Sequence, residues 1–272
     1  MYSTIQFKHN ETEFFGQYWK PQNYKASVII LHGLGEHSGR FSHVAEELIK
    51  HDFAVIAFDH YGHGKTKGKR GHNPGYNAVM NSITAFIKKA EEVLGESPMF
   101  LYGHSMGGNA VLNYMISSTN NIKGVIATSP FLKLAFEPPK WKLSIGKIIQ
   151  KIAPSLTLDN EVDPNFISRI PEEVKKYQDD PLVHSKVSPN FSLVFIEKGA
   201  YAIENASKLN KPALLLHGKD DKLISYLGSE KFAKNNPSVT LKLYNEGYHE
   251  LHNDLCKDQV IQDIITWLKT QA

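Results

Sequence analysis

Five short, nearly continuous apolar runs constrain the fold of this chain more than any other feature of its sequence. They cover residues 26–31, 53–58, 98–102, 122–128 and 212–217. An uninterrupted run of this length, rich in Val, Ile and Leu and followed by Gly-rich or turn-forming residues, is typical of a strand covered on both faces. Such strands occur mainly in parallel sheets with helices on each side. The sequence therefore predicts an α/β fold with a mostly parallel central sheet.

The order of the remaining elements divides the chain into a core and an insertion. Short edge strands are expected at 5–7 and 13–19 and a further strand at 239–244, while helical patterns cover 40–51, 77–94, 106–117, 225–235 and 255–270. This alternation stops between 130 and 206, where prolines and apolar helical patches replace the buried strands. We therefore expect an α/β core of residues 1–129 and 207–272 with a helical cap of residues 130–206. An insertion at the carboxyl edge of a parallel sheet covers the place where such sheets bind ligands.

Composition excludes several classes of protein. The net charge is only +3, and the densest basic stretch, 65–70, reads as a solvated loop, so no nucleic-acid partner is expected. The single cysteine, Cys256, excludes a disulfide within the chain and argues against a Cys-based zinc site. The N-terminus does not resemble a signal peptide, and no run reaches the roughly 18 apolar residues that span a bilayer. The expectation is a soluble, cytoplasmic protein, with peripheral membrane contact left open and no cofactor indicated.

The segment Gly103-His-Ser-Met-Gly107 lies between a predicted strand and a predicted helix. A G-x-S-x-G sequence in this setting predicts a tight turn that exposes the serine above the sheet, and glycines avoid collisions on either side of it. Outside that setting, the same five-residue pattern is an ordinary turn. We therefore expect Ser105 to be a nucleophile.

A serine nucleophile needs a base, and the base needs an acid to orient it. In this fold the order along the chain is serine, acid, histidine. The strand at 212–217 leads to Asp220 and Asp221, and only His249 and His252 follow them, so two candidates remain for each role. The two histidines could also bind a metal, but no third ligand is evident, and Asp254 is better explained as a cap of the last helix.

The tetrahedral intermediate of acyl transfer needs two backbone N–H donors. One is expected from Met106, the residue after the nucleophile. The other is expected from the loop His32-Gly33-Leu34-Gly35 after the first buried strand, with Leu34 as the donor. A plain turn is the alternative explanation for this glycine-rich segment.

Several of these segments together resemble the monoacylglycerol lipases and related lysophospholipases. The similarity is carried by His32-Gly-Leu-Gly-Glu-His-Ser-Gly-Arg40, Phe58-Asp-His-Tyr-Gly-His-Gly64, Gly103-His-Ser-Met-Gly-Gly108, Gly218-Lys-Asp-Asp221 and Tyr248-His-Glu-Leu-His252. The resemblance implies an α/β-hydrolase fold, Asp221 as the acid and His249 as the base, with Gly33 and His104 at the substrate. It also implies a small lipid ester as substrate and no cofactor or metal. Phe41 departs from the tyrosine usual in the family and removes a hydroxyl near the oxyanion loop.

The predicted cap contains a basic amphipathic segment. Trp141, Ile145, Ile148, Ile149 and Ile152 would share one face of a helix, with Lys142, Lys147 and Lys151 off it. Such a helix either lies on a membrane surface or packs its apolar face on the core. Other acyl hydrolases on the same scaffold, a carboxylesterase or a serine aminopeptidase, are rival interpretations. A ligand-binding protein without catalysis is a further alternative, although such proteins usually lack a member of the triad.

Overall fold

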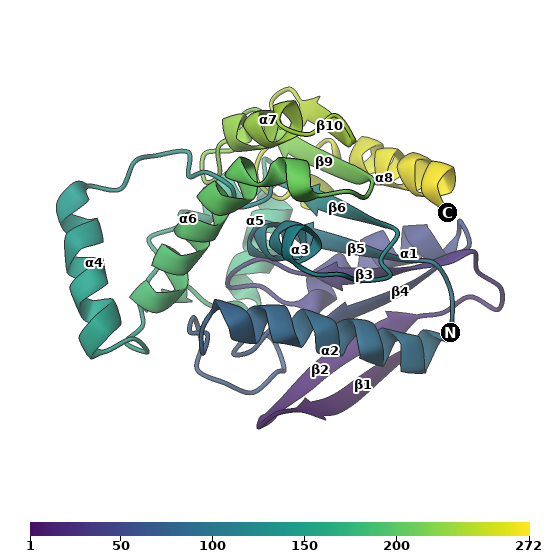
Figure 1. Cartoon of the computed structure of the whole chain (residues 1–272), viewed down its shortest axis with the longest axis horizontal. Helices are drawn as coiled ribbons and strands as arrows, with labels where there is room; N and C mark the ends of the chain where they lie inside the picture. Colours follow the sequence, from purple (N-terminus) through teal and green to yellow (C-terminus); the bar gives the residue numbers. More distant parts are fainter.

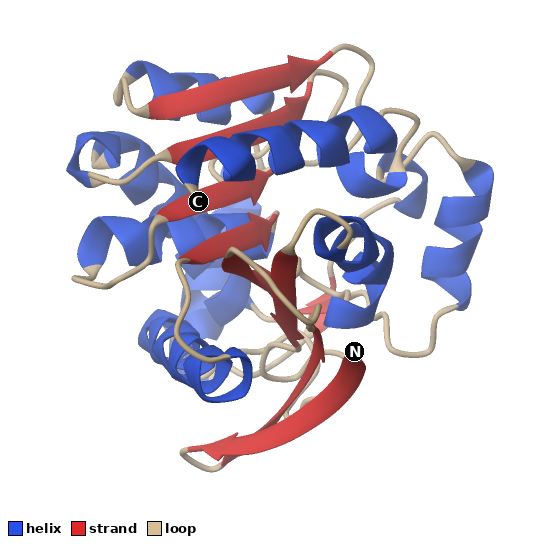
Figure 2. Ribbon diagram, turned by 90° about the vertical axis from the view of Figure 1, so that its right-hand side faces the viewer, coloured by secondary structure: helices blue, strands red, loops and turns tan.

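An eight-stranded, mostly parallel sheet forms the centre of the molecule in the computed structural model, which describes residues 1–272 (Figures 1 and 2). The strand order is β1-β2-β4-β3-β5-β6-β9-β10, and only β1 and β2 run antiparallel to their neighbours. The strands of this sheet are β1 (Tyr2–His9), β2 (Thr12–Trp19), β3 (Ala26–Leu31), β4 (Phe53–Phe58), β5 (Met99–His104), β6 (Gly124–Thr128), β9 (Ala213–Gly218) and β10 (Val239–Tyr244).

Helices cover both faces of the sheet (Figure 2). The helices of the chain are α1 (Ser42–Ile49), α2 (Tyr76–Leu94), α3 (Met106–Ser117), α4 (Lys140–Ile152), α5 (Pro171–Asp179), α6 (Pro189–Glu204), α7 (Tyr226–Lys234) and α8 (Lys257–Gln271). One face packs against α2, α3, α6 and α7, and the other packs against α1 and α8.

Two separate hydrophobic cores explain why the buried strands are apolar at every position. Successive side chains of a strand point to opposite faces of the sheet. In β3, Ile29 and Leu31 belong to the core beneath α2 and α3, whereas Val28 and Ile30 belong to the core beneath α1 and α8. The predicted fold class is therefore confirmed, and all five apolar runs form strands of the sheet. The predicted edge strands are also present, although β1 extends over eight residues instead of three.

Helix boundaries differ from the sequence prediction by a few residues. A 3-10 helix, Ser38–Phe41, precedes α1, so the helical pattern expected at 40–51 begins in a different geometry. The last helix begins at Lys257 rather than near 255. No helix combines the length and apolar character that crossing a bilayer requires.

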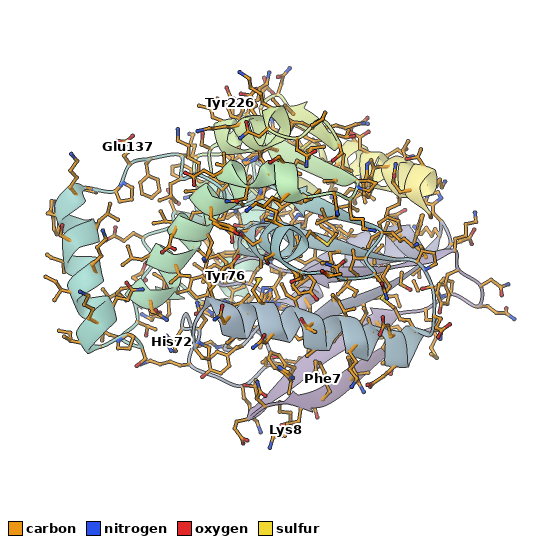
Figure 3. All side chains as sticks on the ribbon, in the orientation of Figure 1. Phe7, Lys8, His72, Tyr76, Glu137 and Tyr226 are labelled. Atoms are coloured by element: carbon orange, nitrogen blue, oxygen red, sulfur yellow. The ribbon has the colours of Figure 1, made fainter.

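The segment between β6 and β9 carries α4, α5 and α6 together with a short antiparallel pair, β7 (Leu158–Asp159) and β8 (Lys186–Val187). Figure 1 shows α6 lying between α4 and the body of the molecule, with α4 at the outer edge. Helix α6 packs on α3, and α4 packs on α6. No residue of α4 is buried, and Figure 3 shows its side chains projecting into open space beyond the loop marked by Glu137. Packing of its apolar face on the core, one of the two expectations for this helix, is therefore wrong.

Candidate active site

Ser105 lies on the tight turn between β5 and α3. Its backbone angles, φ 51° and ψ −111°, are unusual for a residue with a side chain. The flanking glycines make the turn possible, because a Cβ on Gly103 would strike the backbone of Gly107. A Cβ on Gly107 would strike the carbonyl oxygen of Leu31 at the end of β3. The turn therefore points the Ser105 side chain out beyond the carboxyl edge of the sheet.

The structure brings Ser105, His249 and Asp221 into one hydrogen-bonded chain. His249 Nε2 lies 2.9 Å from Ser105 Oγ, and His249 Nδ1 lies 2.7 Å from Asp221 Oδ2. All three residues are buried, whereas Asp220 is exposed. The ring of His252 makes no hydrogen bond and stacks on Phe41. Of the two candidates left open for each role, the geometry joins Asp221 and His249 to the serine.

The electrostatics of the pair suit proton transfer. Burial raises the pKa of the Asp221 carboxyl, but the charges and hydrogen bonds of His249 and His217 outweigh it and hold that pKa well below its usual range. Burial lowers the pKa of His249, but the Asp221 carboxylate more than offsets this and raises it above the usual value. Asp221 therefore stays ionised and stabilises the charged imidazolium.

Ser129 fixes the backbone of His249 and was not anticipated from the sequence. It follows β6, has a positive φ of 43°, and donates a hydrogen bond from its hydroxyl to the His249 carbonyl oxygen over 2.7 Å. The loop that carries the histidine is thereby tied to the sheet. The two residues are 120 positions apart, so nothing local in the sequence indicates the contact.

The loop after β3 approaches the serine closely. A Cβ on Gly33 would lie 3.2 Å from Ser105 Cβ and 3.3 Å from His104 Cδ2, so a larger residue at this position would press on both. Leu34 packs in the same small apolar cluster as Met106, the first residue of α3. The two residues expected to supply oxyanion donors thus lie close to each other, one next to Ser105 in the chain and one in the loop that contacts it.

A buried charged cluster supports this loop. The Gly33 N–H donates to Glu36 Oε1 over 2.6 Å, and Arg40 forms ion pairs with both Glu36 and Glu250. The guanidinium of Arg40 also lies 4.9 Å from the ring centre of Tyr177 in α5. Burial and the neighbouring Glu250 raise the pKa of Glu36 to about 8. Sequence reasoning missed this cluster, although Glu36 and Arg40 lie in the segment after the first buried strand and Glu250 adjoins His249.

The segment that precedes β8 is hydrogen-bonded to the loop that follows β3. The His184 N–H donates to the Gly35 carbonyl oxygen over 2.9 Å, and His37 Nε2 lies 2.8 Å from Asp180 Oδ2. Arg169, also in the inserted segment, is paired with Asp254 at 3.1 Å. Asp254 does not cap the last helix as expected, because its side chain is engaged by Arg169 and by the Tyr248 N–H.

A cavity of about 520 Å³ opens above Ser105 and is walled by α4 and α6. Ser105, His249, Gly33 and His104 line its floor, so the two residues expected at the substrate are both in its wall. Seventeen of the 32 lining residues are hydrophobic, while Glu36 and Glu250 make one part polar. The cavity can hold a long apolar group beside a small polar one.

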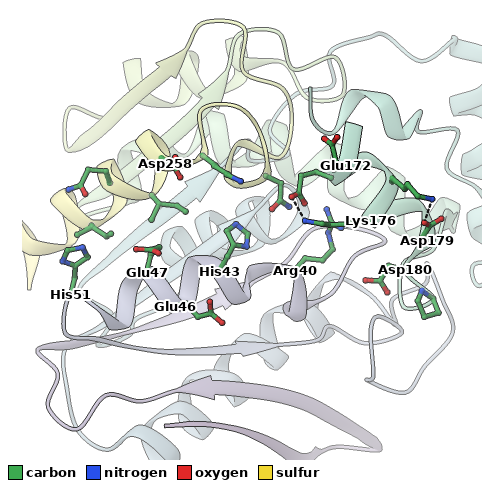
Figure 4. A pocket seen from close by; sticks show the side chains of 18 residues that line it. Arg40, His43, Glu46, Glu47, His51, Glu172, Lys176, Asp179, Asp180 and Asp258 are labelled. Carbon is green, nitrogen blue, oxygen red and sulfur yellow. Dashed lines mark hydrogen bonds and ion pairs between the residues drawn. The ribbon is translucent and has the colours of Figure 1, made fainter. Parts of the chain in front are cut away.

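A larger groove of about 1280 Å³ lies elsewhere, between α1, α5 and α8 (Figure 4). Its lining is charged, with only two hydrophobic residues, and it contains no member of the triad. Its inner wall is Arg40, which pairs with Glu250 of the smaller cavity. Geometry and chemistry therefore make the smaller cavity the candidate active site. No group of three or more potential ligands is arranged to hold a metal ion.

Comparison with known proteins shows which family the whole chain resembles. Residues 22–256 match the family model described as serine aminopeptidase, S33. Rat monoglyceride lipase is 31% identical over 93% of this chain and 86% of its own length. An uncharacterized abhydrolase domain-containing protein of Dictyostelium discoideum is 37% identical over 90% of this chain, which spans 26% of that protein.

The crystal structure of Paleococcus ferrophilus monoacylglycerol lipase superposes with a TM-score of 0.88 at 33% identity, covering 95% of this chain and 99% of that one. The fold is thus shared over nearly the full length of both chains. The chain therefore belongs to the serine aminopeptidase S33 family of α/β-hydrolases, alongside the monoglyceride lipases, and is a serine ester hydrolase.

Proposed function

We propose that the chain hydrolyses monoacylglycerols to a fatty acid and glycerol through an acyl-enzyme on Ser105. The observation that carries the proposal is the contact of Ser105 Oγ with His249 Nε2 at the floor of a largely apolar cavity. The names of the rat and Paleococcus relatives give the same substrate class for those proteins.

The first half of the reaction forms the acyl-enzyme. Ser105 Oγ attacks the ester carbonyl carbon while His249 Nε2 takes the hydroxyl proton, and Asp221 stabilises the resulting imidazolium. The backbone N–H groups of Leu34 and Met106 hold the oxyanion. The carbon–oxygen bond to glycerol then breaks, and His249 returns its proton to the departing glycerol oxygen.

The second half releases the fatty acid. A water molecule gives its proton to His249 and attacks the acyl carbon, and the same two N–H groups hold the second oxyanion. The bond to Ser105 Oγ breaks as that oxygen regains the proton from His249. The enzyme returns to its starting state without a cofactor or metal.

The mixed lining of the cavity suits the two parts of a monoacylglycerol. The apolar walls from α4 and α6 accommodate the acyl chain, and the carboxyl groups of Glu36 and Glu250 accept hydrogen bonds from alcohol hydroxyls. A phosphate-bearing head group would meet these two glutamates, and both nearby cations are already paired: Arg40 with the glutamates, and Lys142 of the lining with Glu161. A lysophospholipid is therefore the less suitable substrate.

Residues 130–206 act in this proposal as a cap that touches the lipid surface from which substrate enters. Trp141, Ile145, Ile148 and Ile152 of α4 are exposed by 48–77%, and lysines flank them. An amphipathic basic helix of this kind lies in the interface of an anionic bilayer. Flotation with vesicles should show binding that strengthens with anionic lipid, and absence of binding to either kind of vesicle would exclude this role.

The catalytic proposal is tested by labelling and by substrate comparison. A fluorophosphonate probe should label the native chain and leave Ser105→Ala unlabelled. A chain-length series of monoacylglycerols should then be hydrolysed faster than a lysophospholipid, a short ester and an aminoacyl amide. Failure to label would favour a ligand-binding protein, and preference for the amide or the short ester would favour an aminopeptidase or a general carboxylesterase.

A further inference from the structure

The carboxylate of Asp221 has a second histidine partner that the reaction described above does not use. His217 is in β9 and is fully buried. Its Nε2 lies 3.2 Å from Asp221 Oδ2 and 3.1 Å from the Ile224 carbonyl oxygen, and its Nδ1 lies 2.8 Å from Ser229 Oγ in α7. The ring thus joins the acid of the triad to a strand and to a helix of the core.

The partners of His217 fix which nitrogen carries a proton. Both atoms facing Nε2 are acceptors, a carboxylate oxygen and a carbonyl oxygen, so Nε2 must be the donor. The atom facing Nδ1 is the Ser229 hydroxyl, which can donate to it. With this arrangement every polar atom of the ring is satisfied inside the core, where an unpaired group is costly.

His217 donates to the same oxygen that holds the catalytic base. Asp221 Oδ2 receives both His217 Nε2–H and His249 Nδ1–H, while Oδ1 receives the backbone N–H groups of Leu223 and Ile224 at 2.9 Å each. The carboxylate therefore has donors on both oxygens and cannot rotate without breaking several bonds. The donors from His217, Leu223 and Ile224 therefore fix the orientation of the carboxylate toward His249.

We propose that His217 is a positioning residue for catalysis, which keeps Asp221 Oδ2 directed at His249 and takes up part of its negative charge. The inference rests on the proposed roles of Asp221 and His249. It adds a fourth side chain, in contact with neither the substrate nor Ser105, that adjusts the strength of the base.

The sign of the effect follows from the two bonds at Oδ2. Without the His217 donor, more of the carboxylate charge acts on His249. The two N–H groups at Oδ1 keep the carboxylate beside His249, but Oδ2 loses one of the two bonds that fix its orientation. The pKa of His249 should then rise further, and the acid limb of the activity profile should move to higher pH. The other titratable groups facing His249, namely Glu36, Glu250, His104 and His252, stay unchanged by this substitution.

A matched pair of variants tests the proposal. The amide nitrogen of glutamine reaches the position of the histidine Nε2, whereas that of asparagine reaches only the position of Nδ1. His217→Asn should lower kcat about tenfold and move the acid limb of kcat/KM upward by about half a pH unit or more. His217→Gln should stay within about twofold of the native chain.

Rates are measured on a water-soluble ester and expressed per active site titrated with a fluorophosphonate, so that misfolded protein does not count. Superimposable pH profiles for His217→Asn and the native chain would overturn the proposal, as would equal losses in both variants. A measurement on the native protein is independent of folding in any variant. In ring nitrogen NMR, His217 Nε2 should carry a proton, and an unprotonated Nε2 would contradict the inference.

The variant Asp221→Asn distinguishes a failure of the His217 inference from a failure of the proposed catalytic mechanism. The proposed mechanism requires that variant to lose about 10⁴-fold in kcat. An active Asp221→Asn protein would refute the mechanism itself. An inactive Asp221→Asn protein beside an unaltered His217→Asn protein would refute only the role of His217.

Discussion

The triad and helix α4 lie on opposite sides of one cavity, and they are held in opposite ways. The side chains of Ser105, His249 and Asp221 are buried and hydrogen-bonded to one another. Helix α4 has thirteen residues, none of them buried, and packs on α6 alone among the major helices. Chemistry that depends on sub-ångström placement is built on the sheet. The wall that meets the acyl chain is attached by few contacts, and it can adapt without disturbing the chemistry.

The largest expected effect comes from removing the nucleophile. Ser105→Ala should lower ester hydrolysis by about 10⁴-fold or more, because neither the acyl-enzyme nor its proton transfer can form. Its thermal unfolding should match that of the native chain, since alanine fits the space left by serine. Activity above a few per cent, measured with a chromogenic ester, would place the nucleophile elsewhere.

A pair of glycine substitutions compares how tightly the serine turn and helix α4 are packed. Gly107→Ala should destabilise the fold by about 3 kcal/mol or more, because its Cβ meets the Leu31 carbonyl oxygen. Gly146→Ala in α4 should stabilise the fold by less than about 1 kcal/mol, because alanine favours a helix more than glycine does. The nearest atom to a Cβ there is Leu193 Cδ1 at 3.5 Å.

Urea unfolding of both glycine variants gives the measurement. Equal losses of stability would mean that α4 is held as tightly as the serine turn, which would remove the contrast between the two regions.

The third prediction addresses the outer face of α4. Ile148→Glu combined with Ile152→Glu should weaken vesicle binding by about tenfold or more, because two exposed isoleucines no longer enter the interface. Neither residue lines the cavity, so turnover of a water-soluble ester should stay unchanged. Leu255→Glu is the matched control, because Leu255 is 66% exposed outside α4 and should leave vesicle binding intact. Similar losses in control and test variants would indicate general charge repulsion.

The smallest expected effect is a displacement in pH. His249 must be neutral to accept the serine proton, and its pKa is raised by Asp221 above the usual range for histidine. Activity should therefore rise with pH through a midpoint above about 6.5. A kcat/KM profile on a soluble ester gives the midpoint. A midpoint below that value would show that burial, rather than the carboxylate, dominates at His249.

Much of the fold and of the candidate site could be predicted from the sequence, but only where the pattern involves residues close together in the chain. The apolar runs predicted the strands, and Gly103 and Gly107 marked the turn at Ser105 within five residues. Chain order left two acids and two bases, and a family resemblance was needed to prefer Asp221 and His249. The distances in the structure agree with that preference.

What the sequence could not supply was pairing across long separations. The bonds from Ser129 to His249 and from Arg40 to Glu250 join residues 120 and 210 positions apart, and no periodicity reports them. The exposure of α4 was equally hidden, because an amphipathic pattern has the same form whether its apolar face meets protein or lipid. His217 lies in the apolar run before both candidate acids, and no local pattern indicates its contact with Asp221.

The bond between His184 and Gly35 has a consequence for how the cavity opens. On that side the cap is fastened to the loop that carries Leu34, so lifting it would also pull one oxyanion donor away from the serine. On the opposite side α4 is held by its packing on α6 and by the exposed ion pair of Lys142 with Glu161. Entry beneath α4 therefore leaves Ser105, His249 and the loop of Leu34 in place, because the edge of residues 130–206 that is fastened to the core lies next to the triad and the exposed face of α4 lies away from it.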